Sequence, residues 1–194
     1  MKIQNLAEDT EDFTGNVWLI ENSEQKILVD ASEGDVWEKI RELDKIDKIV
    51  VTHSHHDHVK NLAKIIEDFN PEIFAYEPEN LPVDAEKFSE GEKIELAELE
   101  FEIFHTPGHR DDSVCLYSPE EKILFTGDLI FPDGSFGRTD LAEGDRDRLI
   151  DSIQKISELD VESFYPGHDG AVTEEANRWI KKSLENAEKR ESKY

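Results

Sequence analysis

The sequence is nearly free of cysteine, because its 194 residues include only Cys115. An intramolecular disulfide is therefore impossible, and so is a zinc site that takes two or more thiolates from one chain. Any metal that this chain binds must be held mainly by histidine, aspartate and glutamate.

Long apolar runs are also missing. No segment approaches the roughly 18 uninterrupted apolar residues that a membrane span needs. The N-terminal stretch through Phe13 lacks the basic start and the apolar run of a secretory signal. We therefore expect a cytoplasmic protein without a membrane partner.

Basic residues are scarce relative to acidic ones, at 22 against 47, so the formal net charge is −25. This balance argues against nucleic acid as a partner, because a phosphate backbone is bound by Lys and Arg that displace counterions. The acids are spread along the chain among apolar residues, which indicates a folded domain with an acidic surface. A salt-rich cytoplasm would screen such a surface, but the excess of Lys over Arg does not favour extreme salt adaptation, and both readings stay open.

The length and the absence of a Pro-, Gly- or Ser-rich linker predict one domain over residues 1–194. Residue patterns in the first half predict a hairpin of strands at 16–22 and 26–32, a helix at 34–43, a strand at 48–51 and a helix at 59–69. A further strand that ends at Phe74 is expected after the second helix. In the second half, one bent strand or two strands are expected at 93–105, followed by a strand pair at 113–119 and 122–128. A helix at 144–159, a strand at 163–168 and a closing helix at 173–191 complete the chain. Asp35 and Thr173 are the expected helix caps. This pattern is an α/β fold with strands inside and helices outside.

Four of the seven histidines crowd into the stretch Thr52–Val59, "THSHHDHV". The remaining candidate residues also follow predicted strands, where a rigid scaffold presents functional side chains. These candidates are His105 and His109 around "TPG", Asp128 after "FTG" and His168 after "YPG". Imidazole and carboxylate suit Zn(II), Fe(II) or Mn(II). His53 and His55 can point one way and Asp57 and His58 another, so two metals with a bridging carboxylate and a bridging hydroxide fit the spacing.

These residues resemble the signature of the metallo-β-lactamase fold superfamily of hydrolases. The Thr-His-x-His-x-Asp-His motif stands at 52–58, and four further landmarks follow the family order over nearly the whole chain, at Asp30, His109, Asp128 and His168. The resemblance implies a four-layer αββα sandwich of two mixed β-sheets flanked by helices. It also implies two Zn(II) per chain, with Fe or Mn as alternatives.

By the same resemblance, each residue of the motif has an expected role. The first metal is assigned to His53, His55 and His109, the second to Asp57, His58 and His168, and the bridge to Asp128. Asp57 and Asp128 are the expected catalytic carboxylates, since Asp57 could also orient the hydroxide or carry a proton. Asp30 is expected to support the ligands, with an ordinary acidic strand end as the alternative. His56 is expected to be a spacer, and His105 a packing or supporting residue.

Within the superfamily, "FPDGSFGRTD" at 131–140 resembles short glyoxalase II-like thioesterases, and its "GRTD" is similar to persulfide dioxygenases. Only 26 residues follow His168, too few for the extra helical domain of the larger glyoxalase II pattern, which puts glutathione in doubt as the carrier thiol. The resemblance implies hydrolysis of a hydroxyacyl thioester, a small-molecule substrate, by a monomer or weak homodimer. Arg138, Tyr165 and Phe136 are candidate substrate contacts, with a salt bridge or aromatic packing as their alternatives.

Other functions remain open on the same residues. One is an enzyme of the persulfide dioxygenase type, with a single iron ion bound by His53, His109 and Asp128. Others are a lactonase or β-lactamase-type hydrolase, or a protein that binds metal without catalysis. A zinc-ligating cysteine near Asp128, usual in metallo-β-lactamases proper, is absent.

Overall fold

The computed structural model describes residues 1–8, 10 and 14–189. The first half of the chain forms a mixed six-stranded sheet in the order β1-β2-β3-β4-β5-β6. The pairs β1/β2 and β2/β3 are antiparallel, and β3, β4, β5 and β6 are parallel neighbours. These strands span Lys2–Asn5, Trp18–Glu21, Lys26–Val29, Lys48–Val50, Glu72–Ala75 and Glu86–Lys87.

The second half forms a five-stranded mixed sheet in the order β13-β10-β9-β8-β7. Only the pair β10/β13 is parallel. The strands are β7 (Lys93–Leu96), β8 (Leu99–His105), β9 (Val114–Ser118), β10 (Ile123–Gly127) and β13 (Ser163–Pro166). A separate small hairpin pairs β11 (Ile130–Phe131) with β12 (Ser135–Phe136).

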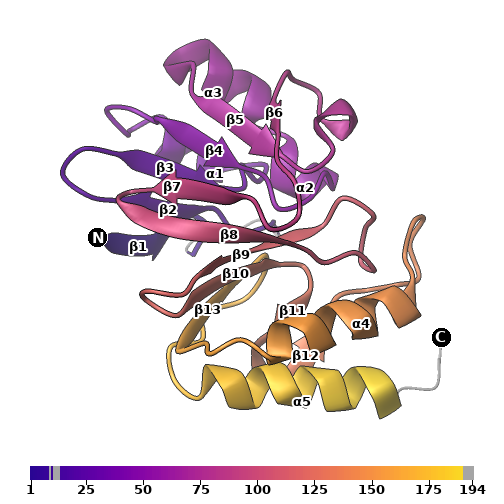
Figure 1. Ribbon diagram of the computed structural model, residues 1–194. Helices are drawn as coiled ribbons and strands as arrows, with labels where there is room; N and C mark the ends of the chain where they lie inside the picture. Colours follow the sequence, from indigo (N-terminus) through magenta and orange to yellow (C-terminus); the bar gives the residue numbers. More distant parts are fainter. Residues whose placement is uncertain (9, 11–13, 190–194) are drawn as a thin grey trace.

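Helices cover the outer face of each sheet (Figure 1). The helices α1, α2 and α3 belong to the first half, and α4 and α5 pack on the second sheet. Their bounds are Val36–Ile40, His56–Val59, Leu62–Phe69, Arg146–Ser157 and Ala176–Lys189, and short 3-10 turns span Pro78–Asn80 and Pro132–Gly134. No helix among the described residues is both long and apolar enough to cross a membrane.

Alternating side chains of the strands explain the layering. In β3, Ile27 and Val29 pack between the two sheets, whereas Leu28 faces the core under α1 and α3. Neighbouring β4 repeats the pattern, with Val50 between the sheets and Ile49 on the helix side. Successive residues of a strand point to opposite faces, so a fully apolar strand is buried on both sides. A third core lies between the second sheet and α4 and α5. The predicted four-layer α/β sandwich of two mixed sheets is confirmed.

Several local predictions need correction. Asp35 makes no capping hydrogen bond and its backbone is helical. The helix expected at 59–69 is shorter, because α3 covers Leu62–Phe69 and Val59 is the last residue of the separate helix α2. Of the two alternatives for 93–105, the structure has two strands, which turn at Ala97 and Glu98 with φ values of 51° and 72°. Helix α5 begins at Ala176, three residues after Thr173, so Thr173 does not cap it. Its expected end at 190–191 lies outside the described residues. The strands β1, β6, β11 and β12 were not predicted.

Candidate metal centre

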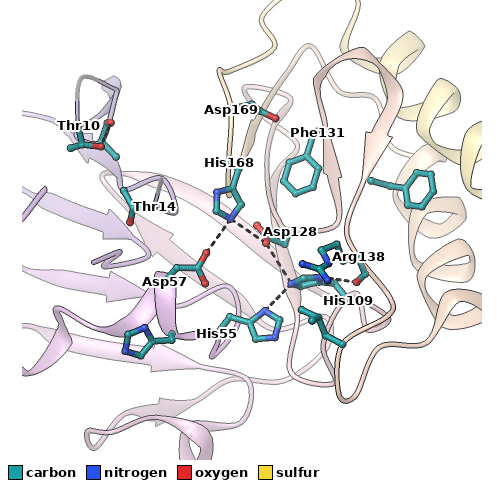
Figure 2. Close-up of a pocket in the computed structure, with 14 residues that line it drawn as sticks. Thr10, Thr14, His55, Asp57, His109, Asp128, Phe131, Arg138, His168 and Asp169 are labelled. Atoms are coloured by element: carbon teal, nitrogen blue, oxygen red, sulfur yellow. Dashed lines mark hydrogen bonds and ion pairs between the residues drawn. The ribbon is translucent and has the colours of Figure 1, made fainter. Parts of the chain in front are cut away.

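The candidate ligands converge because the strands that precede them end at the same edge of the sandwich. His53 and His55 follow β4, and His109 follows β8. Asp128 and His168 follow β10 and β13, which are parallel neighbours and therefore deliver both residues side by side. Figure 2 shows His55, Asp57, His109, Asp128 and His168 pointing toward one another.

The first group of ligand atoms consists of three imidazole nitrogens. His55 Nδ1 lies 3.1 Å from His53 Nε2 and 2.8 Å from His109 Nε2. His53 is 2% and His109 is 4% exposed. These three residues form one of the clusters among the described residues whose ligand atoms all lie within 4.8 Å of one another.

The second group consists of Asp57, His58 and His168, which satisfy the same criterion. Asp57 Oδ2 lies 3.3 Å from His168 Nε2 and 3.8 Å from His58 Nε2. Asp128 faces both groups, since its Oδ2 lies 3.4 Å from the Nε2 atoms of His109 and His168, and its Oδ1 lies 3.4 Å from His58 Nε2.

These separations fit divalent metal ions. Two ligand atoms at about 2.1 Å from a tetrahedral zinc lie about 3.4 Å apart, which matches the distances from Asp128 to its three neighbours. His58 Nε2 and Asp128 Oδ1 are buried and have no hydrogen-bond partner among the described residues. A buried polar atom without a partner is costly, and a metal between these two atoms would satisfy both. His58, Asp128 and His53 also form a third ligand cluster.

Buried acceptors orient the histidines. Asp30, 2% exposed, accepts hydrogen bonds from Thr52 N and Thr52 Oγ1, both at 2.7 Å, and its Oδ2 lies 2.8 Å from His58 Nδ1. His109 Nδ1 donates to the carbonyl oxygen of Arg138 at 2.9 Å. When Nδ1 donates in this way, Nε2 is left as the free ligand atom. Asp30 therefore contacts a candidate ligand directly, as a residue supporting the site would.

A glycine next to His168 allows the close approach of the two groups. A Cβ atom on Gly167 would lie 2.1 Å from Asp128 Oδ1 and 2.8 Å from His58 Cε1. The same loop is held by Asn16, whose Nδ2 donates at 2.8 Å to the carbonyl oxygens of Pro166 and of Asp169. Sequence analysis missed Asn16, although a polar residue at the start of an apolar strand was a visible signal.

The imidazoles differ in their electrostatic environment. Burial, reinforced by neighbouring histidines, lowers the pKa of His53 well below its ordinary value and that of His55 to about 4. Burial also opposes protonation of His58 and His168, but the surrounding carboxylates outweigh it, so the pKa of His58 is well above its ordinary value and that of His168 is about 9. The hydrogen bond from His168 lowers the pKa of Asp57 to about 2. The first group is thus neutral, while metal binding by the second group must release protons.

An open pocket of about 690 Å³ leads to this cluster. Among its lining residues are Phe131, Phe136, Leu141 and Arg138. Arg138 makes two hydrogen bonds to Asp140, both at 2.9 Å, and both side chains are exposed. The structure thus brings Phe136 and Arg138 to the pocket.

Three other sequence candidates do not reach the ligand cluster. Tyr165 is not among the lining residues, because its ring packs against Trp18 and Phe125 with centroids 5.1 Å from each. His56 lines the pocket but is exposed, with Nδ1 3.5 Å from a carboxylate oxygen of Glu33. His105 stacks on a tyrosine ring at 4.0 Å, and its Nε2 lies 2.7 Å from a backbone carbonyl oxygen. The ring of Tyr165 thus makes the aromatic packing that the sequence left open as the alternative to a substrate contact.

Comparison with known sequences identifies one family. The model of the metallo-beta-lactamase superfamily matches residues 10–168. The hydroxyacylglutathione hydrolase of Francisella philomiragia subsp. philomiragia is 31% identical over 156 residues, which cover 78% of this chain and 62% of that protein. The chain thus spans less than two thirds of the length of this curated relative.

Solved structures share the fold of this chain. TTHA1623 in a di-iron-bound form has a TM-score of 0.74 at 24% identity, with 96% of this chain and 97% of that chain covered. ETHE1 from Myxococcus xanthus has a TM-score of 0.76 at 21% identity, with 97% and 91% covered. At these identities the likeness shows the fold and does not show the activity.

Proposed function

Because the chain belongs to the metallo-beta-lactamase superfamily, we propose that it is a dinuclear metal-dependent hydrolase that cleaves a thioester of the hydroxyacyl-thiol type. The observation that carries this proposal is the position of Asp128 between two ligand groups. Its two carboxylate oxygens face histidines of both groups at 3.4 Å, in a pocket open to a small molecule.

The cytoplasm is the proposed location.

The metals we propose are two Zn(II), with Fe or Mn as alternatives. Bound divalent metal would supply Lewis acidity and a hydroxide nucleophile at neutral pH. The first ion would be held by His53, His55 and His109, the second by Asp57, His58 and His168, and both by Asp128.

The chain's own residues provide the remaining parts of the mechanism. Asp57 lines the pocket and is one third exposed, and its low pKa keeps it ionised, so it can accept a hydrogen bond that orients a nucleophile. Asp128 is buried between the two ligand groups, so its role is to bind both metal ions and keep the groups together. Phe131, Phe136 and Leu141 form an apolar side of the pocket that suits the acyl chain or the methylene groups of a thiol.

The carrier thiol is a separate question. The relative from Francisella philomiragia is named for hydroxyacylglutathione, and its similarity supports a thioester substrate. Arg138 is the one arginine or lysine among the described pocket residues, and Asp140 already binds it. A thiol with two carboxylates, such as glutathione, finds little charge compensation there, so we propose a smaller or less acidic thiol.

A substrate panel tests the proposal. Purified protein with two equivalents of zinc should hydrolyse S-lactoylglutathione or another thioester faster than a lactone or nitrocefin. The variant His55→Ala should lose most of the activity, because it removes a ligand from the first group. Turnover of phosphodiesters alone, or full activity in His55→Ala, would refute the proposal.

A second candidate is a mononuclear iron enzyme that oxidises a persulfide. It is favoured by a set of two histidines and one carboxylate, since Asp128 Oδ2 lies 3.4 Å from His109 Nε2 and 4.0 Å from His53 Nε2. Such an enzyme would contain about one iron per chain and consume oxygen with glutathione persulfide. That result would replace the hydrolase proposal.

A further inference from the structure

Three polar side chains, Ser54, Arg110 and Asp112, connect the two loops that carry the first ligand group. Ser54 stands between His53 and His55, and Arg110 directly follows His109. We call these three residues the Ser54 network. None of them is a candidate metal ligand, and none lines the pocket.

The hydrogen bonds of the Ser54 network converge on one carboxylate. Asp112 Oδ2 accepts from the backbone N–H of Ser54 at 3.2 Å and also from the Ser54 hydroxyl. Arg110 Nε donates to Ser54 Oγ at 2.9 Å. Both the backbone and the side chain of Ser54 are thus held, which restricts the orientations of its neighbours His53 and His55.

The burial of Asp112 indicates that this arrangement is specific. Asp112 is 4% exposed, and its Oδ1 is buried without a hydrogen bond among the described residues. The nearest compensating charge is Arg110 Nε, 3.2 Å from Oδ1. A buried carboxylate is costly unless it is paired. Arg110 and Asp112 both lie in the loop of His109, and their hydrogen bonds to Ser54 tie that loop to the His53–His55 loop.

The second ligand group is supported by other contacts. Asp30 contacts His58, and Asn16 holds the loop of His168. Asp30 also accepts a hydrogen bond from Thr52, whose hydroxyl oxygen lies 3.2 Å from His53 Nδ1, so this contact reaches both groups. The Ser54 network makes none of these contacts. Weakening it should therefore disturb the first group more than the second.

We propose that Asp112 and Arg110 are positioning residues that set the affinity of the first metal position through Ser54. This inference rests on the metal centre of the proposed function. In Asp112→Asn, the amide oxygen can still accept from Ser54, but the negative charge that pairs with Arg110 is gone. The loss of a residue that orients metal ligands typically costs about 10- to 100-fold in metal affinity.

The test is a titration of chelator-treated, full-length protein with Co(II) in the presence of a competing chelator. The absorption spectrum of the bound Co(II) reports two binding steps, one for each ligand group. The step that belongs to the first group is identified with His168→Ala, which removes a ligand of the second group only. We expect Asp112→Asn to weaken this step by about 10- to 100-fold and to leave the other within about threefold. Ser54→Ala should weaken the same step to a smaller extent, and it serves if Asp112→Asn does not fold.

Asp111→Asn is the matched control, because Asp111 is adjacent, carries the same carboxylate and pairs with Arg148 instead of Ser54. It should leave both steps unchanged. Equal weakening of both steps in Asp112→Asn, or no weakening in either Asp112→Asn or Ser54→Ala, would overturn the inference. The titration uses no substrate, so a protein that binds two metals without cleaving thioesters would refute the proposed function and leave this inference standing.

Discussion

The substitution Gly167→Ala places one methyl group at the narrowest point between the two ligand groups. The new Cβ would lie 2.1 Å from Asp128 Oδ1, although real Cβ atoms essentially never approach other atoms closer than 3.0 Å. The carboxylate, or the Gly167 backbone, must therefore move by about 0.9 Å. His58 Cε1 at 2.8 Å and the Gly127 carbonyl carbon at 3.0 Å leave little room for that movement.

The consequences can be scaled from this displacement. Misplacing a catalytic group by about 1 Å can cost about 100-fold in rate, and overpacking a buried site costs about 1–3 kcal/mol of stability. We expect Gly167→Ala to lose at least about 100-fold in kcat/KM, with a reduced metal content by mass spectrometry. Activity on the best thioester of the panel and urea unfolding are the assays.

Gly170→Ala provides a matched control in the same loop. No atom outside its immediate chain neighbours lies within 4 Å of a Cβ built on Gly170. This variant should keep wild-type metal content and activity. If Gly167→Ala also keeps two metals and full activity, then the reasoning that Asp128 is held in place between the groups is wrong.

Three further predictions follow from the described contacts. Asp30→Asn should weaken binding of the second metal in a chelator competition assay, because His58 loses a buried charged acceptor. It should also lower the free energy of unfolding by about 1–3 kcal/mol. An unchanged metal affinity and an unchanged stability would contradict the role of Asp30. Burial raises the pKa of Cys115 to about 12, so the folded protein should not react with a thiol reagent between pH 7 and 9, where this thiol stays protonated, and should react only on unfolding. Arg138→Ala should leave the urea unfolding midpoint unchanged, because this ion pair is exposed, but it should raise KM for an acidic thioester. Asp140→Ala frees the arginine and should not raise KM; the same KM in Arg138→Ala as in the wild type would exclude Arg138 from substrate binding.

The overall architecture followed from the sequence because its strands are buried on both faces. Runs such as Lys26–Val29 and Lys48–Val50 have no polar alternation, and they indicated an inner sheet covered by helices. The edge strand β6 is two residues long and both residues are exposed, so it carries no such signal. Strand β1 was missed for a related reason, since its four residues are polar or only partly buried.

The candidate ligands were predictable because each stands directly after a strand or in one dense motif. Residues that contact the ligand loops from distant positions in the sequence were not predictable in this way. Asp112 and Ser54 are 58 positions apart, and no local pattern connects a serine to an aspartate in another loop. For Tyr165 the sequence left two alternatives open, because proximity to His168 in sequence does not determine the direction of a side chain. Tyr165 lies on β13, and its ring packs against Trp18 and Phe125.

The central claim is a centre for two metals joined by Asp128, and metal analysis of the purified full-length protein tests it most directly. Elemental mass spectrometry of wild type and of Asp128→Asn should be measured on the same preparation, together with the metal-to-metal distance by X-ray absorption. We predict two equivalents in the wild type, separated by about 3.5–4 Å, and fewer than two in Asp128→Asn. One equivalent of iron in the wild type, with no second metal after reconstitution, would contradict the account.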